Sequence, residues 1–278
     1  MSNLSKGQNE RRVCVITGGG SGMGLASAKI IGKDHYIIIA GRTVKKLDGA
    51  IDELHKAGIE AEAVACDISN AESVKKLAEK SASIGKVASV IHAAGLSPHM
   101  GDAKTIMEVN ALGTIHVNEA FYEVMGSGSC VIDVSSMSGY LLPNVVLPKG
   151  NYPLSRTDKD LFMKKMMRRV NLFPQKLRSG VAYGISKHFV IWYARTDAVK
   201  FGAKGIRVLS VSPGSFETPM GELEKDNIEG YLEKSAFKRV GKVEEIASLL
   251  AFCASDKPGY LTGTDILCDG GCVAAKSS

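Results

Sequence analysis

The sequence predicts an α/β protein in which helices cover both faces of one doubly wound, parallel sheet of about seven strands. Short apolar runs alternate with helical patterns of roughly 10 to 15 residues, which is typical of right-handed β-α-β units. A glycine-rich loop separates the first apolar run from the first helical one. The 278 residues and 45% hydrophobic content suffice for one large core. We therefore expect a single domain over residues 12–272, between short tails at 1–11 and 273–278.

Composition and charge exclude several classes of protein. No apolar run approaches the roughly 18 residues that a membrane-spanning helix needs, and the first dozen residues are polar. We therefore expect a soluble, cytoplasmic protein with no membrane span and a flexible start. The six cysteines are scattered without metal-ligand spacing, so no metal site is predicted. A diffuse net charge of +6 agrees with anionic ligands and does not indicate nucleic acid.

The glycine-rich loop runs from Thr17 to Gly24, between an apolar strand at residues 12–17 and a helical run at 25–31. Glycines allow a tight turn there and let a pyrophosphate approach backbone N–H groups at a helix N-terminus. The spacing is Gly-x-x-x-Gly-x-Gly and not the literal G-x-G-x-x-G, although the strand before it and the helix after it are the required context. The alternative is a flexible surface turn. The predicted cofactor-binding residues of the loop are Gly18, Ser21, Gly22, Met23 and Gly24.

The second strand, at residues 36–40, ends in Gly41 and Arg42 and precedes a helix at 44–57. In dinucleotide-binding folds an acidic residue at this position holds the ribose 2′-hydroxyl, whereas an arginine accommodates a 2′-phosphate. Arg42 therefore favours NADP(H) over NAD(H). Ser21 stands where a second basic residue would strengthen that preference, so we expect it to be moderate.

Polar residues follow the next strands where each strand ends. The third strand, 61–66, leads into Asp67; the fourth, 87–91, leads into His92; and the fifth, 129–134, leads into Ser135 and Ser136. Ligands bind at the carboxyl ends of such strands, so the hydroxyls of Ser135 and Ser136 are predicted to face the site. A serine pair at a strand end is otherwise a turn former or a helix cap. Helical patterns at 71–83 and 102–125 connect these strands.

Tyr183 and Lys187 are the strongest candidates for chemistry. They lie four positions apart at the start of a helical run that extends to Ala198, so both project from one face. A cation about 4 Å from a phenol is worth roughly 4 kcal/mol at an effective dielectric of 20, enough to lower the phenol pKa by about three units. Tyr183 could then transfer a proton at neutral pH. The alternative is a half-buried ring beside a solvated amine.

The rest of the chain completes the sheet. A sixth strand at 205–212 ends in Pro213 and Gly214, and a polar, flexible stretch continues to about Lys238. A helix at 243–254 and a last strand at 262–271 follow.

In joint order, these motifs resemble the short-chain dehydrogenase/reductase family over residues 12–271. They are the loop at 17–24, Asp67, Ala94-Gly95, Asn110, Ser136, Tyr183 with Lys187, Pro213-Gly214 with Thr218, and the closing Asp269-Gly-Gly. The resemblance implies that Asn110, Ser136, Tyr183 and Lys187 are catalytic, with Asn110 holding a water in the proton path. It implies that Asp67 and Ile68 border the adenine, that Ala94 and Gly95 lie under the cofactor, and that Phe216 and Thr218 meet the nicotinamide carboxamide. It also implies homotetramers or dimers formed partly through the helix that carries Tyr183.

Two departures from the family pattern stand out. The family usually has Asn-Asn-Ala-Gly after the fourth strand, and His92-Ala93 replaces the two amides here, which puts a supporting hydrogen bond in doubt. The stretch between Ser136 and Tyr183 is also far longer than usual, as in some members that act on steroids.

The inserted segment, residues 141–179, is predicted to contain a loop followed by a helix. Two prolines interrupt residues 140–148, so we expect an extended loop. Residues 157–160 resemble a capping box, and apolar residues including Met163, Met166 and Met167 follow at helical spacing, opposite a basic face. The methionines are predicted to line a mobile lid over a bulky lipophilic substrate. The alternative is a helix packed on the protein body or on another subunit.

The sequence therefore predicts an NADP(H)-dependent oxidoreductase acting on a secondary alcohol or ketone, with a steroid or bile acid as the favoured substrate class. The alternatives are a reductase of smaller ketones or 3-oxoacyl substrates and a non-catalytic dinucleotide sensor. Epimerase or dehydratase chemistry gains no support from the short C-terminus.

Overall fold

The computed structural model describes residues 11–222, 230, 232–233 and 235–275, which contain a seven-stranded sheet in the order β3-β2-β1-β4-β5-β6-β7. Every neighbouring pair of strands is parallel. The strands are β1 (Arg12–Thr17), β2 (Tyr36–Gly41), β3 (Ala61–Ala65), β4 (Lys86–His92), β5 (Cys130–Val134), β6 (Arg207–Pro213) and β7 (Asp265–Cys268). The predicted single-domain α/β architecture is confirmed.

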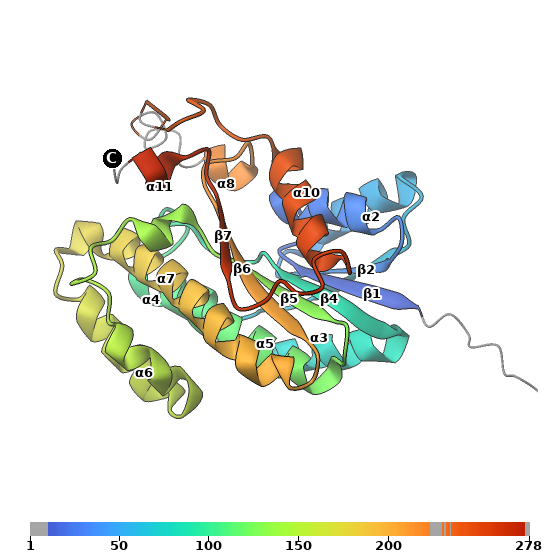
Figure 1. Cartoon of the computed structure of the whole chain (residues 1–278), viewed down its shortest axis with the longest axis horizontal. Helices are drawn as coiled ribbons and strands as arrows, with labels where there is room; N and C mark the ends of the chain where they lie inside the picture. Colours follow the sequence, from blue (N-terminus) through green and yellow to red (C-terminus); the bar gives the residue numbers. More distant parts are fainter. Residues whose placement is uncertain (1–10, 223–229, 231, 234, 276–278) are drawn as a thin grey trace, which may run out of the picture.

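Helices cover both faces of the sheet and give it two apolar cores (Figure 1). Alternation along β1 shows the division: Val13 and Val15 contact the core under α3, α5 and α7, whereas Cys14 and Ile16 contact the core under α1, α2 and α10. The helices are α1 (Gly22–Ile31), α2 (Val44–Lys56), α3 (Ala71–Ile84), α4 (Ala103–Met107), α5 (Gly113–Val124), α6 (Lys159–Val170), α7 (Gln175–Gly202), α8 (Pro219–Glu222), α10 (Val243–Ala254) and α11 (Cys272–Ala275). No helix within the described ranges is long and apolar enough to cross a bilayer.

Most predicted elements agree with the structure to within a few residues, and three boundaries differ. The helix that carries Tyr183 begins at Gln175, after Pro174, because proline is well suited to a helix start. The last strand is only Asp265–Cys268, since Gly263 and Gly270 adopt positive φ on either side of it. The predicted tails at 1–11 and 273–278 fall mostly outside the described residues. Arg11, however, pairs with Glu60, and residues 273–275 belong to α11.

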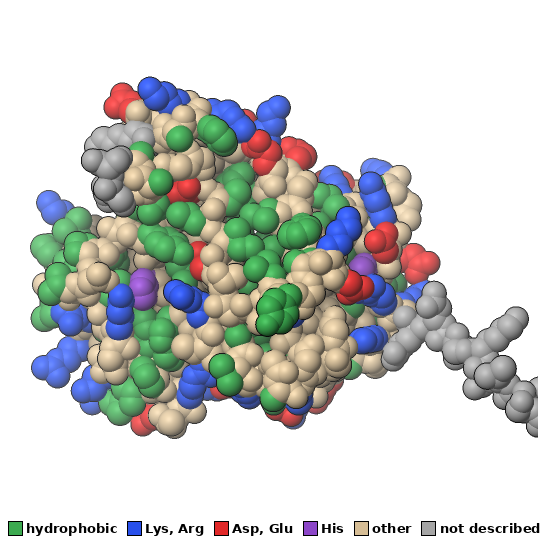
Figure 2. Space-filling view, in the orientation of Figure 1, with side chains coloured by type: hydrophobic (Ala, Val, Ile, Leu, Met, Phe, Trp, Pro, Cys, Tyr) green, Lys and Arg blue, Asp and Glu red, His purple; other side chains and the backbone are tan. Residues whose placement is uncertain are grey.

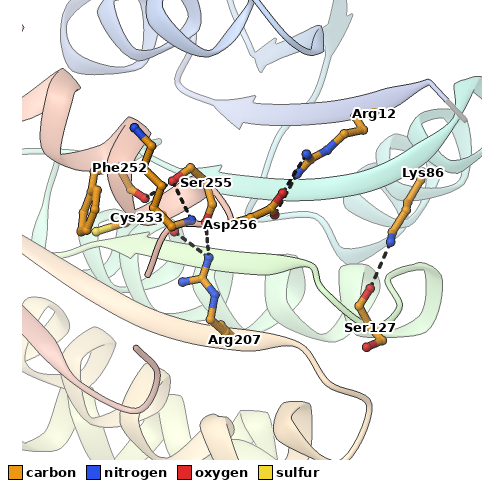
Figure 3. A network of polar contacts seen from close by, with 9 residues as sticks. Arg12, Lys86, Ser127, Arg207, Phe252, Cys253, Ser255 and Asp256 are labelled. Atoms are coloured by element: carbon orange, nitrogen blue, oxygen red, sulfur yellow. Dashed lines mark hydrogen bonds and ion pairs between the residues drawn. The ribbon is translucent and has the colours of Figure 1, made fainter. Parts of the chain in front are cut away.

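Arg12 and Arg207, at the amino ends of β1 and β6, contact the chain at the end of α10 (Figure 3). Arg207 of β6 donates to the carbonyl oxygens of Cys253 and Ser255 at the end of α10, at 2.9 and 2.7 Å. Arg12 of β1 makes a two-pronged ion pair with Asp256 just beyond that helix. A guanidinium therefore satisfies terminal helix carbonyls and ties α10 to the central strands. The carboxyl ends of the strands lie at the opposite end of the sheet, and the candidate site is located there.

The inserted segment folds into three short pieces. A 3-10 turn over Met137–Tyr140 is followed by irregular chain, then by a 3-10 helix over Lys149–Arg156 and by α6. The predicted helix is confirmed, but Asp158, and not Thr157, is its N-cap and accepts a hydrogen bond from the N–H of Leu161.

The segment from Lys149 to Val170 packs against α7 and α5. Tyr152 is fully buried, with its ring 5.3 Å from that of Phe189 and 5.4 Å from that of Trp192, and its hydroxyl contacts His188. Phe162 of α6 lies 4.8 Å from the same Phe189 ring. These aromatic contacts between residues 149–170 and α7 form a continuous buried cluster.

Ion pairs fasten the same segment. Arg156 pairs with the buried Asp197 and lies over the rings of Trp192 and Tyr193, while Lys159 pairs with Glu119 of α5 at 2.6 Å. The arrangement corrects one expectation, because the methionines of α6 face the protein core and not a pocket. The aromatic side chains of α7 pack against this chain's own residues 149–170.

Candidate active site

A cavity of about 310 Å³ opens at the carboxyl ends of the strands, where predicted ligand-facing residues converge. The loop after β1, the start of α7 and the chain after β6 form its walls. Of the predicted site residues, the cavity is lined by Gly18, Ser21, Gly22, Met23, Gly24, Arg42, Ile68, Ala94, Gly95, Ser136, Tyr183, Lys187, Phe216 and Thr218. No residue of the inserted helix α6 is among the residues that line it.

The glycine loop has the close packing that its sequence predicts. Gly18 adopts φ +71°, and a Cβ there would lie 2.8 Å from the backbone nitrogen of Ala94. A Cβ on Gly24 would lie 2.6 Å from the carbonyl oxygen of Gly18. Both positions therefore require glycine. Ser21 is the N-cap residue of α1, so the first N–H groups of this ten-residue helix point into the cavity, where an anion is stabilised.

Arg42 stands exposed at the end of β2, on the cavity wall next to Gly41. A side chain at Gly41 would meet only Leu47, at 3.6 Å, so the position has room for a larger residue. Asp67, expected to border the adenine, lies beside the cavity lining: one of its carboxylate oxygens accepts hydrogen bonds from the N–H and hydroxyl of Ser69. Ile68 does line the cavity.

Tyr183 and Lys187 project into the cavity from one face of α7, as their spacing predicts. The Lys187 ammonium lies 5.8 Å from the centre of the Tyr183 ring and donates to the carbonyl oxygen of Val134, at 3.0 Å. Lys187 is only 7% exposed, so its charge acts in surroundings with little water. Its own carbonyl accepts from the hydroxyl of Ser135, which fastens α7 to the end of β5.

Ser136 lies on the cavity wall, whereas Asn110 is buried and does not line the cavity. Ser136 lines the cavity and its hydroxyl caps the following 3-10 turn, accepting from the N–H of Ser138 at 3.1 Å. Asn110 is buried within a π-helical turn, Glu108–Leu112, that joins α4 to α5. Its side-chain amide exchanges hydrogen bonds with the backbone of Leu96 in both directions and donates to Ser186. Asn110 thereby links the loop after β4 to α7.

His92 replaces the missing amide. Its Nδ1 lies 2.8 Å from the hydroxyl of Thr17, and that hydroxyl also accepts from the N–H of Ala94, at 3.2 Å. A hydrogen bond between His92 and Thr17 therefore joins β4 to the start of the glycine loop. Burial, with the nearby Lys187 charge, lowers the pKa of His92 to about 3, so the ring is neutral at physiological pH.

His92 belongs to a row of polar side chains that crosses the sheet, all of them buried except the partly exposed Asp265. Thr17, His92, Asp133, Ser210 and Asp265 occupy paired positions on five consecutive strands, β1, β4, β5, β6 and β7. Asp133 accepts a hydrogen bond from Asn118 of α5, at 2.9 Å, and burial raises its pKa to about 7. A neutral histidine and a carboxyl group of raised pKa are thus neighbours beneath the catalytic candidates.

The loop after β6 closes the site. Phe216 pairs with Gly241 in an isolated bridge, and the side chain of Thr218 approaches Gly22 of the glycine loop. These contacts bring the predicted nicotinamide-end residues against the phosphate-end loop.

Two family models match the chain. The model described as short chain dehydrogenase matches residues 12–166, more than half of the chain, and the model described as enoyl-(acyl carrier protein) reductase matches residues 174–273. The chain belongs to the short-chain dehydrogenase/reductase family. Members of this family bind a nicotinamide dinucleotide, and the glycine loop, the α1 N-terminus and the cavity beside Tyr183 fit such a group.

Similar proteins span nearly the whole chain. The short-chain dehydrogenase/reductase bsc3 of Alternaria brassicicola is 31% identical over 265 residues, covering 94% of this chain and 95% of its own. The 3-oxoacyl-[acyl-carrier-protein] reductase FabG of Thermotoga maritima is 27% identical over 276 residues, covering 95% and 98%. A solved short chain dehydrogenase of Burkholderia cenocepacia J2315 in complex with NADP superimposes with a TM-score of 0.74 at 21% identity, covering 93% and 96%.

Several residues that line the cavity of this dehydrogenase/reductase were not predicted, because no motif in the sequence marks them. Leu96, Met100 and Val109 come from the loop and helix after β4, and Met220 follows the loop after β6. Ser135 and Asp133 were visible as polar residues at the end of a strand, but their partners depend on which strands and helices lie alongside.

Proposed function

We propose that the protein transfers a hydride between NADP(H) and a secondary alcohol or ketone. The observation that carries the proposal is the meeting of Tyr183, Lys187 and Ser136 in one cavity with an anion-binding helix N-terminus. When bound, the dinucleotide would donate a hydride to a ketone or accept one from an alcohol, and the protein must move one proton to or from the substrate oxygen in step.

The proposed roles follow from the positions. Tyr183 exchanges the proton with the substrate oxygen through its hydroxyl, and the Lys187 ammonium stabilises the phenolate that results. Ser136, on the same cavity wall, donates a hydrogen bond that orients that oxygen. Asn110 holds the loop after β4 against α7, and in this proposal its place in the proton path is through a bound water, as in the family pattern.

The cofactor preference is proposed from Arg42. A planar guanidinium at the end of β2 suits a phosphate dianion, and no carboxylate stands at Gly41 to repel it. We expect the native protein to use NADP(H) with a higher kcat/KM than NAD(H). Gly41→Asp should lower kcat/KM for NADP(H) by roughly 5- to 10³-fold, for a charge repulsion of about 1 to 4 kcal/mol at 4 Å.

Gly41→Asn is the matched control, because it adds a side chain of the same size without a charge, and position 41 has room for it. Kinetics with both cofactors would be compared in the three proteins. A native preference for NAD(H), or an equal loss in the asparagine variant, would contradict the proposal.

The substrate is proposed to be bulky and lipophilic, such as a steroid or a bile acid. Support comes from the apolar side chains that line the cavity, including Leu96, Met100, Val109, Met137 and Met220; methionines adapt to irregular apolar shapes. Across a panel of ketones with NADPH, kcat/KM should rise about fourfold for each further methylene buried, at about 0.8 kcal/mol each. A panel in which the smallest ketones react best, followed by nicotinamide absorbance, would refute this choice.

A second candidate is reduction of a smaller ketone or a 3-oxoacyl substrate. The observation that favours it is the resemblance to the 3-oxoacyl-[acyl-carrier-protein] reductase of Thermotoga maritima along nearly the whole chain. The same panel separates the two, because a 3-oxoacyl thioester would then exceed every steroid in kcat/KM.

Self-association is part of the proposal, with a dimer or tetramer of cytoplasmic location. Because residues 149–170 cover the aromatic face of α7, we place the contact at the outer edge of the sheet. There β7 is the last strand of the sheet formed by the described residues, and Phe252 and Tyr260 are exposed. Light scattering on the intact protein measures the mass, and a monomer would refute the contact.

A further inference from the structure

One extremity of the molecule combines exposed leucines with a cluster of lysines and arginines. It consists of α6, the turn at residues 171–174 and the first residues of α7, and it lies at the left in Figure 1. Leu172 is 70% exposed, Leu177 48% and Leu161 36%. Figure 2 shows hydrophobic and basic side chains gathered at this edge. We call this region the α6–α7 tip.

The tip is strongly basic. Residues 161–178 contain Lys164, Lys165, Arg168, Arg169, Lys176 and Arg178, and no aspartate or glutamate occurs between Leu161 and Thr196. The first five of these cations form no ion pair with any carboxylate in the described part of the chain. The flanking Asp197 is already paired with Arg156. The described residues therefore supply no carboxylate that pairs with these five cations.

The tip is also well defined in shape. Arg178 donates to the carbonyl oxygens of Phe173 and Asn171, at 2.9 and 3.3 Å, which closes the turn between the two helices. Beneath the turn, Met166 and Val170 are fully buried in the main core. Leu172 and Leu177 are thus held on a fixed turn on either side of Pro174, and their exposure is a property of the fold.

The tip adjoins the mouth of the active-site cavity. The hydroxyl of Ser179, in the first turns of α7, donates to the carbonyl oxygen of Gly101, at 3.3 Å. Gly101 follows Met100, which lines the cavity and is itself 43% exposed. Asp102, the next residue along the chain, accepts a hydrogen bond from the N–H of Thr105 as the cap of α4.

We propose that the α6–α7 tip docks on an anionic lipid bilayer. Leucines that project from a turn can enter the region between headgroups and acyl chains, while surrounding lysines and arginines meet anionic headgroups. The charges are complementary, and the surface is a protruding turn with leucines ringed by cations. A protein partner would instead need a broader complementary surface with polar contacts. Docking would bring the cavity mouth to the source of a lipophilic substrate, but the proposal rests on the tip and not on the proposed function.

The test is sedimentation of the intact protein with phosphatidylcholine vesicles, with and without phosphatidylserine. We expect binding only when phosphatidylserine is present, and its loss as salt approaches about 1 M, where the Debye length falls to about 3 Å. Lys164→Gln with Arg168→Gln should weaken the partition coefficient about 30-fold, at roughly fivefold for each cation. Leu172→Ser with Leu177→Ser should weaken it at least about tenfold.

Matched controls lie elsewhere on the surface. Lys75→Gln with Lys76→Gln removes the same charge from α3, and Val199→Ser removes an exposed apolar side chain from the far end of α7. Neither should change vesicle binding. Three results overturn the proposal: no binding to phosphatidylserine vesicles, binding that the tip variants leave unchanged, or equal loss in the controls. An acidic protein partner would appear as salt-sensitive binding to polyglutamate without vesicle binding, which also overturns it.

Discussion

Tyr183→Phe should give a protein that folds and binds NADPH but turns over its substrate about 10²- to 10⁴-fold more slowly. The change removes only the hydroxyl, and the ring stays against the cavity wall beside Lys187. In the proposed mechanism turnover requires a transferable proton at that point, whereas dinucleotide binding is proposed to depend on the glycine loop and Arg42. Steady-state kcat with the best substrate and fluorescence titration with NADPH would measure the two effects separately.

Tyr152→Phe is the matched control for this experiment. It removes a hydroxyl from a buried tyrosine that packs on the same helix, where it contacts His188 and not the cavity. Its turnover should stay within a few-fold of native. If Tyr183→Phe retained near-normal turnover, or if both variants lost it equally, Tyr183 would not be the acid/base.

The second large effect concerns His92 and Asp133, whose contributions to stability change with pH in opposite directions. The folded pKa of His92 is lowered to about 3, so its contribution is present above its unfolded value near 6.5 and is lost as the pH falls. The folded pKa of Asp133 is raised to about 7, so its contribution is present below its unfolded value near 3.8 and is lost as the pH rises. Between about pH 4 and 6.5 the two slopes cancel, each at about 1.36 kcal/mol per pH unit.

Single variants should therefore reveal opposite slopes. Relative to the native protein, His92→Asn should gain about 2 to 3 kcal/mol in free energy of unfolding as the pH falls from 6.5 to 4. Asp133→Asn, which keeps an acceptor for Asn118, should gain a similar amount as the pH rises over the same interval. Urea unfolding at several pH values would measure both differences. A difference from native that stays constant with pH would contradict the assigned protonation states.

The alternation of strands and helices was predictable because the strands occur as short apolar runs and the helices as longer segments with apolar residues at helical spacing. The predicted ends of helices were wrong where the local sequence allowed more than one starting residue. The helical run was expected to start at Tyr183, whereas the helix already begins at Gln175, and Gly180 lies within it. Thr157 and Asp158 are both good caps, and only the backbone decided between them.

Much of the site was predictable because parallel strands all end at one edge. Arg42, Ser136 and the glycine loop converge for that reason, and Tyr183 with Lys187 follows from helical spacing. The partners of His92 and Asp133 were not predictable, because they depend on strand order and register.

The position of the inserted helix could not be predicted from the sequence either. An amphipathic helix has the same pattern whether it lies over a cavity or over another helix. The deciding partners, Phe189, Trp192 and Tyr193, are aromatic residues on α7 that would equally suit a subunit contact.

The covering of α7 has a consequence for motion. With the sheet on one side and residues 149–170 on the other, α7 is buried from Val181 to Ala194 except at Tyr183, His188 and Trp192. Amide hydrogens along that stretch can exchange with solvent only when the inserted segment detaches or the whole domain opens. The proposed proton-transferring pair thus stands on what should be among the slowest-exchanging backbone in the described part of the chain, and we expect substrate entry and release to depend on movements of the loops that face it.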